Sequence, residues 1–190
     1  MPPIVVRPFR PEDAPDLGET YYQLYDERDA GELVGITLFT QRPSAEDEKS
    51  WYDKQFERAQ SGEVIFLVAE VDGRVVGNCV IGRHGPSDLS EEAHVGELGI
   101  LVGRDMRGQG VGTALLRHAL EAARRRFDVV YLSVFAFNTR AQRLYERFGF
   151  VECGRLPRML KRGGRYFDQV RMVLVFDHDP SGQGPTVKHP

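Results

Sequence analysis

Three glycines at alternate positions, Gly108, Gly110 and Gly112, stand out as residues that could bind a ligand. A strand-like apolar run at residues 98–102 precedes them, and a helix-like run at residues 114–123 follows. A loop without bulky side chains lets several backbone N–H groups turn toward one point, where the following helix also directs its positive end. The segment therefore predicts an anion cradle that suits a phosphate or pyrophosphate.

The spacing separates three kinds of glycine-rich phosphate loop. A P-loop ends in Gly-Lys-Ser/Thr, but Gly112-Thr113-Ala114 has no lysine. The dinucleotide fingerprint needs a small residue five positions after its first glycine, and counting from Gly108 that residue is Thr113. Arg107-x-x-Gly110-x-Gly112 resembles at every position the Q/R-x-x-G-x-G/A loop of the GNAT superfamily of acetyl-CoA-dependent N-acetyltransferases. Taken alone, the segment is also explained as a surface turn before a helix.

A second, independent motif has the same resemblance. Asn138-Thr139-Arg140-Ala141 leads into Leu144-Tyr145-Glu146-Arg147-Phe148-Gly149-Phe150, which is similar in order and spacing to the GNAT segment after the fifth strand. The resemblance spans residues 64–176 and implies a three-layer α/β sandwich with a mixed, mostly antiparallel central sheet flanked by helices. It also implies acetyl-CoA as cosubstrate, an amine acceptor and, as is common in the superfamily, a homodimer.

The resemblance assigns residues to the cofactor. Backbone groups on the strand before the loop would pair with the pantetheine amides, the glycine loop would hold the pyrophosphate, and Asn138 would contact the pantetheine. The expected cofactor-binding residues are Ile100, Leu101, Val102, Arg107, Gly108, Gln109, Gly110, Val111, Gly112, Thr113, Asn138, Ala141 and Tyr145.

Acetyl transfer from a thioester needs an unprotonated amine and a proton for the departing thiolate. By resemblance, Tyr145 points at the cofactor sulfur, and a phenol with an ordinary pKa of about 10 suits a general acid at neutral pH. Tyr145 also belongs to the apolar face of its helix, so a core residue is the alternative interpretation. Glu97 is the expected base, because an apolar setting in its strand would raise the pKa of its carboxyl. The alternative interpretation of Glu97 is a strand carboxylate that pairs with a neighbouring arginine. His94 and Asp168 are weaker candidates for the base.

Local patterns predict alternating strands and helices. The loop pair Asp72-Gly73 indicates a hairpin, Asn138 is placed to cap a helix, and Gly149 to end it. Gly163-Gly164 indicates another hairpin turn, or else a loop at the rim of the acceptor pocket. The predicted strands are residues 4–7, 64–71, 75–82, 95–102, 129–137, 151–156 and 169–176, and the predicted helices are residues 11–24, 44–60, 110–126 and 139–148.

The 190 residues, 41% hydrophobic and 28% charged, are typical of a globular protein. We expect a single acetyltransferase domain at residues 1–176 and a flexible polar tail at residues 177–190. The two cysteines lack metal-site spacing, and neither a signal peptide nor an apolar run long enough for a membrane span is evident. A cytoplasmic protein without a metal or membrane partner is therefore expected.

Charge is unevenly distributed along the chain. Residues 11–60 hold 13 Asp/Glu and 5 Lys/Arg, a net of −8, whereas residues 103–165 hold 14 Lys/Arg and 5 Asp/Glu, a net of +9. The basic part suits a ligand with several phosphates. An acidic acceptor side would favour a cationic amine, although solvated helix faces explain the same pattern.

Two functions from different classes remain. The first is an N-acetyltransferase acting on a small-molecule or protein amine by direct attack in a ternary complex. The second is a non-catalytic acyl-CoA-binding regulatory module on the same fold. A nucleic-acid binder is not expected, because the net charge is −3 and the cofactor explains the basic residues.

Overall fold

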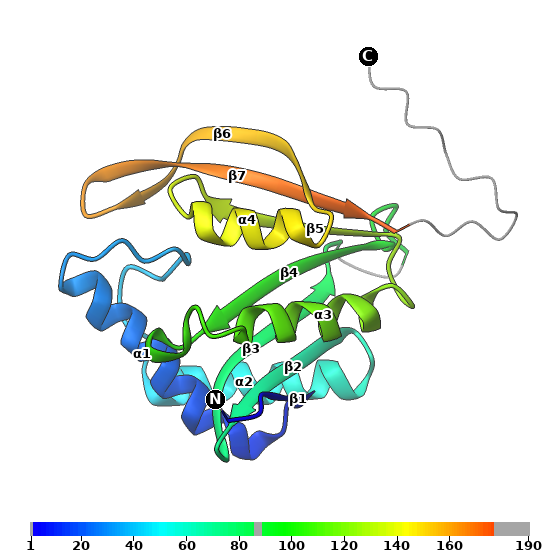
Figure 1. Ribbon diagram of the computed structural model, residues 1–190, viewed down its shortest axis with the longest axis horizontal. Coiled ribbons are helices and arrows are strands. Elements are labelled where there is room, and N and C mark those ends of the chain that lie inside the picture. Colours follow the sequence, from blue (N-terminus) through cyan, green and yellow to red (C-terminus); the bar gives the residue numbers. More distant parts are fainter. Residues whose placement is uncertain (1, 86–88, 177–190) are drawn as a thin grey trace, which may run out of the picture.

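The computed structural model describes residues 2–85 and 89–176. Its central feature is a seven-stranded sheet in the order β1-β2-β3-β4-β5-β7-β6 (Figure 1). The strands are β1 (Val5–Pro8), β2 (Val64–Val71), β3 (Arg74–Arg83), β4 (Val95–Val102), β5 (Val129–Phe135), β6 (Val151–Arg162) and β7 (Arg165–Val175). The α-helices are α1 (Ala14–Asp29), α2 (Ala45–Gln60), α3 (Val111–Ala123) and α4 (Thr139–Arg147). All neighbouring strands are antiparallel except β4 and β5, which confirms the predicted mixed sheet.

Helices cover both faces of the sheet because its strands carry apolar side chains on both faces. On β2, Ile65 and Ala69 belong to the core cluster that α3 completes with Leu115 and Leu116. Val64, Phe66 and Val68 of β2 belong to a second cluster with Leu17 of α1 and Tyr52 of α2. Successive side chains of a strand point to opposite faces, so the two clusters lie on the two sides of the sheet. The expected three-layer sandwich is confirmed.

The strands β4 and β5 pair over only three residues. Val95, Gly96 and Glu97 lie opposite Val129, Val130 and Tyr131, and no pairing between the two strands extends beyond them within the described residues. The later residues of β4 continue to pair with β3, and those of β5 with β7. The two strands are therefore unpaired with each other beyond Glu97, and the cavity described below lies between them.

The last hairpin is longer than predicted. The sequence indicated strand ends near Leu156 and Gln169, but β6 continues past Pro157 to Arg162 and β7 begins at Arg165. The ladder shifts register between Leu156 and Leu160, and Arg158 adopts φ +55. A proline is tolerated at such a bulge on an edge strand, where its missing N–H breaks no ladder bond. Gly163 and Gly164, at φ +54 and +77, form the predicted turn.

The other elements agree with the sequence to within a few residues. The bounds of β2 and β4 are as predicted, whereas α1 continues to Asp29 rather than ending near Leu24. Within residues 2–85 and 89–176, no helix has the length and apolar character that crossing a bilayer requires. The predicted flexible tail at residues 177–190 lies outside the described residues.

Candidate active site

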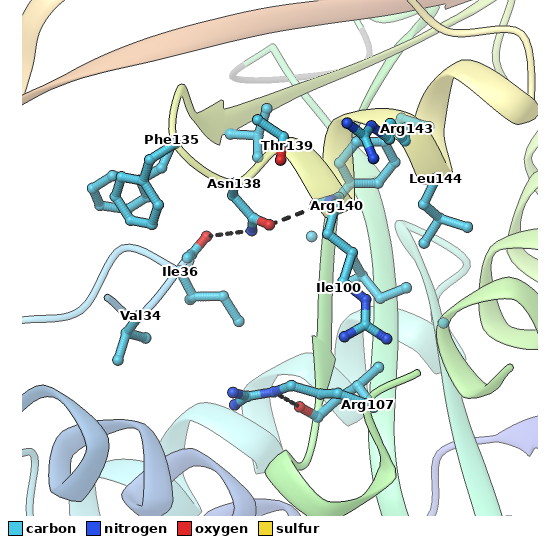
Figure 2. Close-up of a pocket in the computed structure, with 18 of the residues that line it drawn as sticks. Val34, Ile36, Ile100, Arg107, Phe135, Asn138, Thr139, Arg140, Arg143 and Leu144 are labelled. Atoms are coloured by element: carbon cyan, nitrogen blue, oxygen red, sulfur yellow. Dashed lines mark hydrogen bonds between the residues drawn. The ribbon is translucent and has the colours of Figure 1, made fainter. Parts of the chain in front are cut away.

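A cavity of about 1010 Å³ opens between β4 and β5, bordered by the start of α3, the start of α4 and residues 33–37 (Figure 2). Its two ends differ in chemistry. Figure 2 shows Val34, Ile36 and Phe135 on one side, and Arg140 and Arg143 on the other. The charged residues among its described lining are all arginines: Arg107, Arg140, Arg143 and Arg147. The arrangement suits a ligand with an anionic part and an apolar part.

The glycine loop forms one wall of the arginine-lined end. Gly108 and Gly110 adopt φ +83 and +89, and Gly110 is the residue from which α3 begins. A Cβ atom on Gly108 would lie 2.5 Å from Nη2 of Arg140, so the loop backbone and this guanidinium are in close approach. Backbone N–H groups of a left-handed loop at a helix N-terminus form an anion-binding concavity. The local geometry fits a phosphate group beside Arg140.

The side chain of Arg107 differs from its expected role. Its Nη1 and Nη2 each donate to a carboxylate oxygen of Glu27 at 2.8 Å, and its Nε donates to the Val102 carbonyl at 3.1 Å. Glu27, on α1, is only 4% exposed. The sequence placed Arg107 in the loop expected to hold the pyrophosphate, but its guanidinium is paired with a buried carboxylate. Arg107 anchors the loop to α1 through its side chain, and only its backbone is left for a phosphate.

Ten of the thirteen residues expected to bind the cofactor line the cavity. The three that do not are Leu101, Gln109 and Val111. The Gln109 side chain donates to the Asp105 carbonyl, and Val111 is 1% exposed in the core. Because alternate residues of a strand and of a loop point away from the ligand side, a continuous stretch of sequence cannot all face the cavity.

Asn138 lies at the centre of the cavity wall. Its Oδ1 accepts a hydrogen bond from the Ala141 N–H at 3.2 Å, which confirms the predicted cap of α4. Its Nδ2 donates to the Gly35 carbonyl at 3.4 Å, a contact across 103 positions that the sequence did not indicate. The second hydrogen of Nδ2 is left for a ligand.

Tyr145 is packed in the core and also lines the cavity. Its side chain is 6% exposed, and its ring lies 5.8 Å from that of Phe150 in the main core. Its hydroxyl makes no side-chain hydrogen bond with the described residues, and the residue lines the cavity. Burial raises the pKa of this phenol above its ordinary value. The group is therefore protonated at neutral pH and free to donate a hydrogen bond into the cavity.

Glu97 lies on the other face of the sheet. It borders a smaller hollow of about 320 Å³, together with Trp51 and Arg58, and Leu98 and Gly99 line both hollows. The expected apolar setting is wrong, since the carboxylate is 52% exposed. Its partner is His84 rather than an arginine, with 3.3 Å between Nδ1 and Oε2. The sequence missed this histidine because the contact requires the β3–β4 register.

The weaker candidate bases, Asp168 and His94, take part in backbone contacts of β6 and β5. The Asp168 carboxylate accepts a hydrogen bond from the Arg158 N–H at 2.9 Å and so stabilises the bulge of β6. The His94 carbonyl accepts from the N–H groups of Asp128 and Val129 ahead of β5. Neither residue lines the cavity.

The acidic excess of residues 11–60 is largely used within the protein. Nine of its thirteen carboxylates form ion pairs or accept hydrogen bonds, and none lines the described part of the larger cavity. These nine are Asp13, Asp16, Glu19, Asp26, Glu27, Asp29, Glu32, Asp47 and Asp53. The charge pattern therefore describes helix surfaces and internal pairs rather than an acidic pocket.

Comparison with known proteins now identifies the family. Residues 32–150 match the model of the Acetyltransferase (GNAT) family. The chain belongs to this family. It is therefore a GNAT acyltransferase. The chain is 33% identical over 111 residues to the L-amino acid N-acetyltransferase AaaT of Escherichia coli, and the alignment covers 57% of this chain and 67% of that protein.

Solved structures agree with this assignment. The ribosomal-protein-alanine N-acetyltransferase of Brucella melitensis is 28% identical, with a TM-score of 0.78 over 90% of this chain and 99% of that one. The Salmonella typhimurium protein yncA, solved with acetyl-CoA, shares the fold at a TM-score of 0.79 and 21% identity, over 95% and 98% of the two chains.

Gly110 offers a direct test of the loop geometry. We expect Gly110→Ala to weaken acetyl-CoA binding roughly 10-fold, because a left-handed backbone costs a residue with a Cβ about 1–2 kcal/mol and the loop relaxes away from its cradle. Isothermal titration calorimetry measures the change. Gly73→Ala is the matched control, since Gly73 has φ +75 in the β2–β3 turn and an added Cβ there meets nothing within 4 Å. Equal affinities of the two variants would contradict the cradle.

Proposed function

We propose that this GNAT protein transfers the acetyl group of acetyl-CoA to a primary amine by direct attack in a ternary complex. The Tyr145 hydroxyl carries the proposal, because it has no hydrogen-bond partner among the described residues and Tyr145 lines the cavity that has the glycine loop and arginines at one end. The pyrophosphate fits the backbone of residues 107–113 with Arg140 beside it. The pantetheine fits between β4 and β5, where the edge of Ile100 and Val102 is not paired with β5.

The chemistry needs two proton transfers. Glu97 accepts the proton of the amine through a water molecule in the hollow that adjoins the cavity at Leu98 and Gly99. The amine nitrogen then forms a bond to the acetyl carbon as the carbon–sulfur bond breaks. Tyr145 donates its proton to the departing thiolate, for which a phenol kept neutral by burial is suited. Holding both reactants in one cavity supplies much of the remaining rate.

Turnover distinguishes this proposal from a non-catalytic acyl-CoA-binding module. The names of the Escherichia coli and Brucella melitensis relatives specify amino acids and a protein alanine, so L-amino acids and short peptides are the first acceptors to try. We expect a thiol reagent to report CoA release and mass spectrometry to detect an N-acetylated product. Binding of acetyl-CoA without product from any amine would favour the regulatory module.

The role of Glu97 can be tested separately. We expect Glu97→Gln to lower kcat/KM for the amine about 10²-fold near neutral pH, the lower end of the contribution of a positioned base. The deficit should shrink at higher pH, because more of the amine is then unprotonated without help. Glu91→Gln, which changes an exposed carboxylate in the same region, is the control. A loss that is independent of pH would contradict the role of a base.

A further inference from the structure

Residues 33–37, between α1 and α2, form part of the cavity wall although they belong to no helix or strand. Three consecutive carbonyls of this segment accept side-chain hydrogen bonds. Nη1 and Nη2 of Arg162 donate to the Val34 and Ile36 carbonyls at 2.5 and 2.6 Å. Nδ2 of Asn138 donates to the Gly35 carbonyl between them. The segment is thus fixed to the end of β6 and to the start of α4.

Arg162 is held in place for this task. Its guanidinium lies 4.9 Å from the centre of the Phe135 ring, within the range of a cation–π contact. Burial, and then the charge of Arg28, lower the pKa of Arg162 from its ordinary value, yet a guanidinium stays charged at any physiological pH. Gly35 completes the contact, because a Cβ there would collide with the Asn138 amide.

The fixed segment encloses an apolar end of the cavity. The lining side chains there come from the segment, from β5 and the turn that follows it, and from β6: Leu33, Val34, Ile36, Phe135, Phe137 and Leu160. The Phe135 and Phe137 rings are 4.9 Å apart. Uncharged Thr37, Ser133 and Gln169 add polar groups. The described lining of the cavity contains no carboxylate, so a second positive charge placed here would have no counter-ion.

We propose that this end of the cavity is the acceptor subsite, and that it selects amines whose side chain or hydrocarbon tail is apolar and carries no second positive charge. Arg162 acts as a positioning residue for the subsite by holding residues 33–37. The inference rests on the proposed acetyltransferase function and names the substrate class of that site. It replaces the cationic acceptor that the sequence charge pattern suggested.

Two matched pairs of amines isolate the charge. L-norleucine carries a hydrogen where L-lysine carries its side-chain ammonium. Likewise, n-hexylamine carries a methyl group where cadaverine carries its second ammonium. We expect kcat/KM to favour the apolar member of each pair by about 10-fold or more, the discrimination typical of an apolar pocket. A preference for lysine and cadaverine would overturn the inference and leave the acetyltransferase standing. No turnover of any amine by protein that binds acetyl-CoA would overturn both.

Variants of residues around the subsite test its construction. We expect Arg162→Ala to raise the KM for L-norleucine about 10-fold, to leave the Kd for acetyl-CoA within about twofold, and to speed hydrogen exchange of residues 33–37. Arg162→Lys should restore part of the effect, and Arg155→Ala, an exposed change on the same strand, should have none. An equal loss of affinity for both substrates would overturn the positioning role.

A further substitution keeps the test decisive if Arg162→Ala does not fold. Thr37→Asp adds a carboxylate at an exposed position that lines the subsite. We expect it to shift the norleucine-to-lysine ratio of kcat/KM at least 10-fold toward lysine, since it supplies the missing counter-ion. An unchanged ratio would show that the acceptor binds elsewhere and would overturn the inference.

Discussion

Replacing Tyr145 by phenylalanine is expected to lower kcat about 10²- to 10³-fold and to leave the Kd for acetyl-CoA nearly unchanged. The substitution removes only a hydroxyl that makes no hydrogen bond within the described residues, while the ring keeps its packing against Phe150. The thiolate then has to leave without its proton, which accounts for a loss of the size typical of general acid catalysis. Steady-state kinetics and calorimetry on the same sample measure the two quantities.

The pH dependence of the wild-type enzyme adds a second readout for Tyr145. Burial raises the pKa of the phenol above 10, so the acid form is present up to at least that pH. We therefore expect kcat to show no loss of the acid below pH 10. The matched control for Tyr145→Phe is Tyr166→Phe, which removes the hydroxyl of a half-exposed tyrosine on β7. Its kcat and its Kd for acetyl-CoA should equal those of the wild type. An equal fall of kcat and acetyl-CoA affinity in Tyr145→Phe would show a packing role instead.

Replacing Glu27 by glutamine is expected to have the largest effect on stability. Glu27 is only 4% exposed, and its carboxylate accepts two hydrogen bonds from Arg107. The substitution removes this negative charge and leaves the Arg107 guanidinium without its charged partner. Breaking a buried ion pair costs roughly 3–5 kcal/mol, and because Arg107 is 36% exposed we expect about 2 kcal/mol. Such a loss lowers Tm by roughly 4–8 °C in a protein of this size. Thermal and urea unfolding measure it.

The same substitution should also weaken acetyl-CoA binding, because Arg107 connects the glycine loop to α1. Glu32→Gln is the control, since its pair with Arg104 is exposed on both sides and is expected to change stability by less than about 0.5 kcal/mol. If the two variants unfold at the same temperature, the Glu27–Arg107 pair does not anchor the loop.

Local signals in the sequence were sufficient for most elements. The Asp72-Gly73 turn and the alternating apolar residues around it fix β2 and β3, and the cap at Asn138 and Gly149 at φ +91 mark the ends of α4. These features depend on neighbours within a few positions of the chain, which is why pattern and turn chemistry predict them.

The parts that the sequence did not show depend on distant contacts. Arg107 donates hydrogen bonds to Glu27, which lies 80 positions away in the chain, and Arg162 donates to the Val34 carbonyl, 128 positions away. Glu97 is exposed because its strand face is turned toward α2 and the hollow beside Trp51, a fact set by sheet order rather than by alternation alone. Residue types and spacing thus located the glycine loop that lines the cavity, whereas the proposed acceptor side depends on the packing of α1, β6 and the segment between α1 and α2.

Calorimetric titration of the protein, freed of bound CoA, with acetyl-CoA tests most directly whether the cavity between β4 and β5 binds this cosubstrate. We expect one molecule per chain with a Kd in the micromolar range, and about 10-fold weaker binding by Gly110→Ala. A folded sample that shows no binding heat and no change of Tm with acetyl-CoA would contradict the proposal that this cavity binds acetyl-CoA.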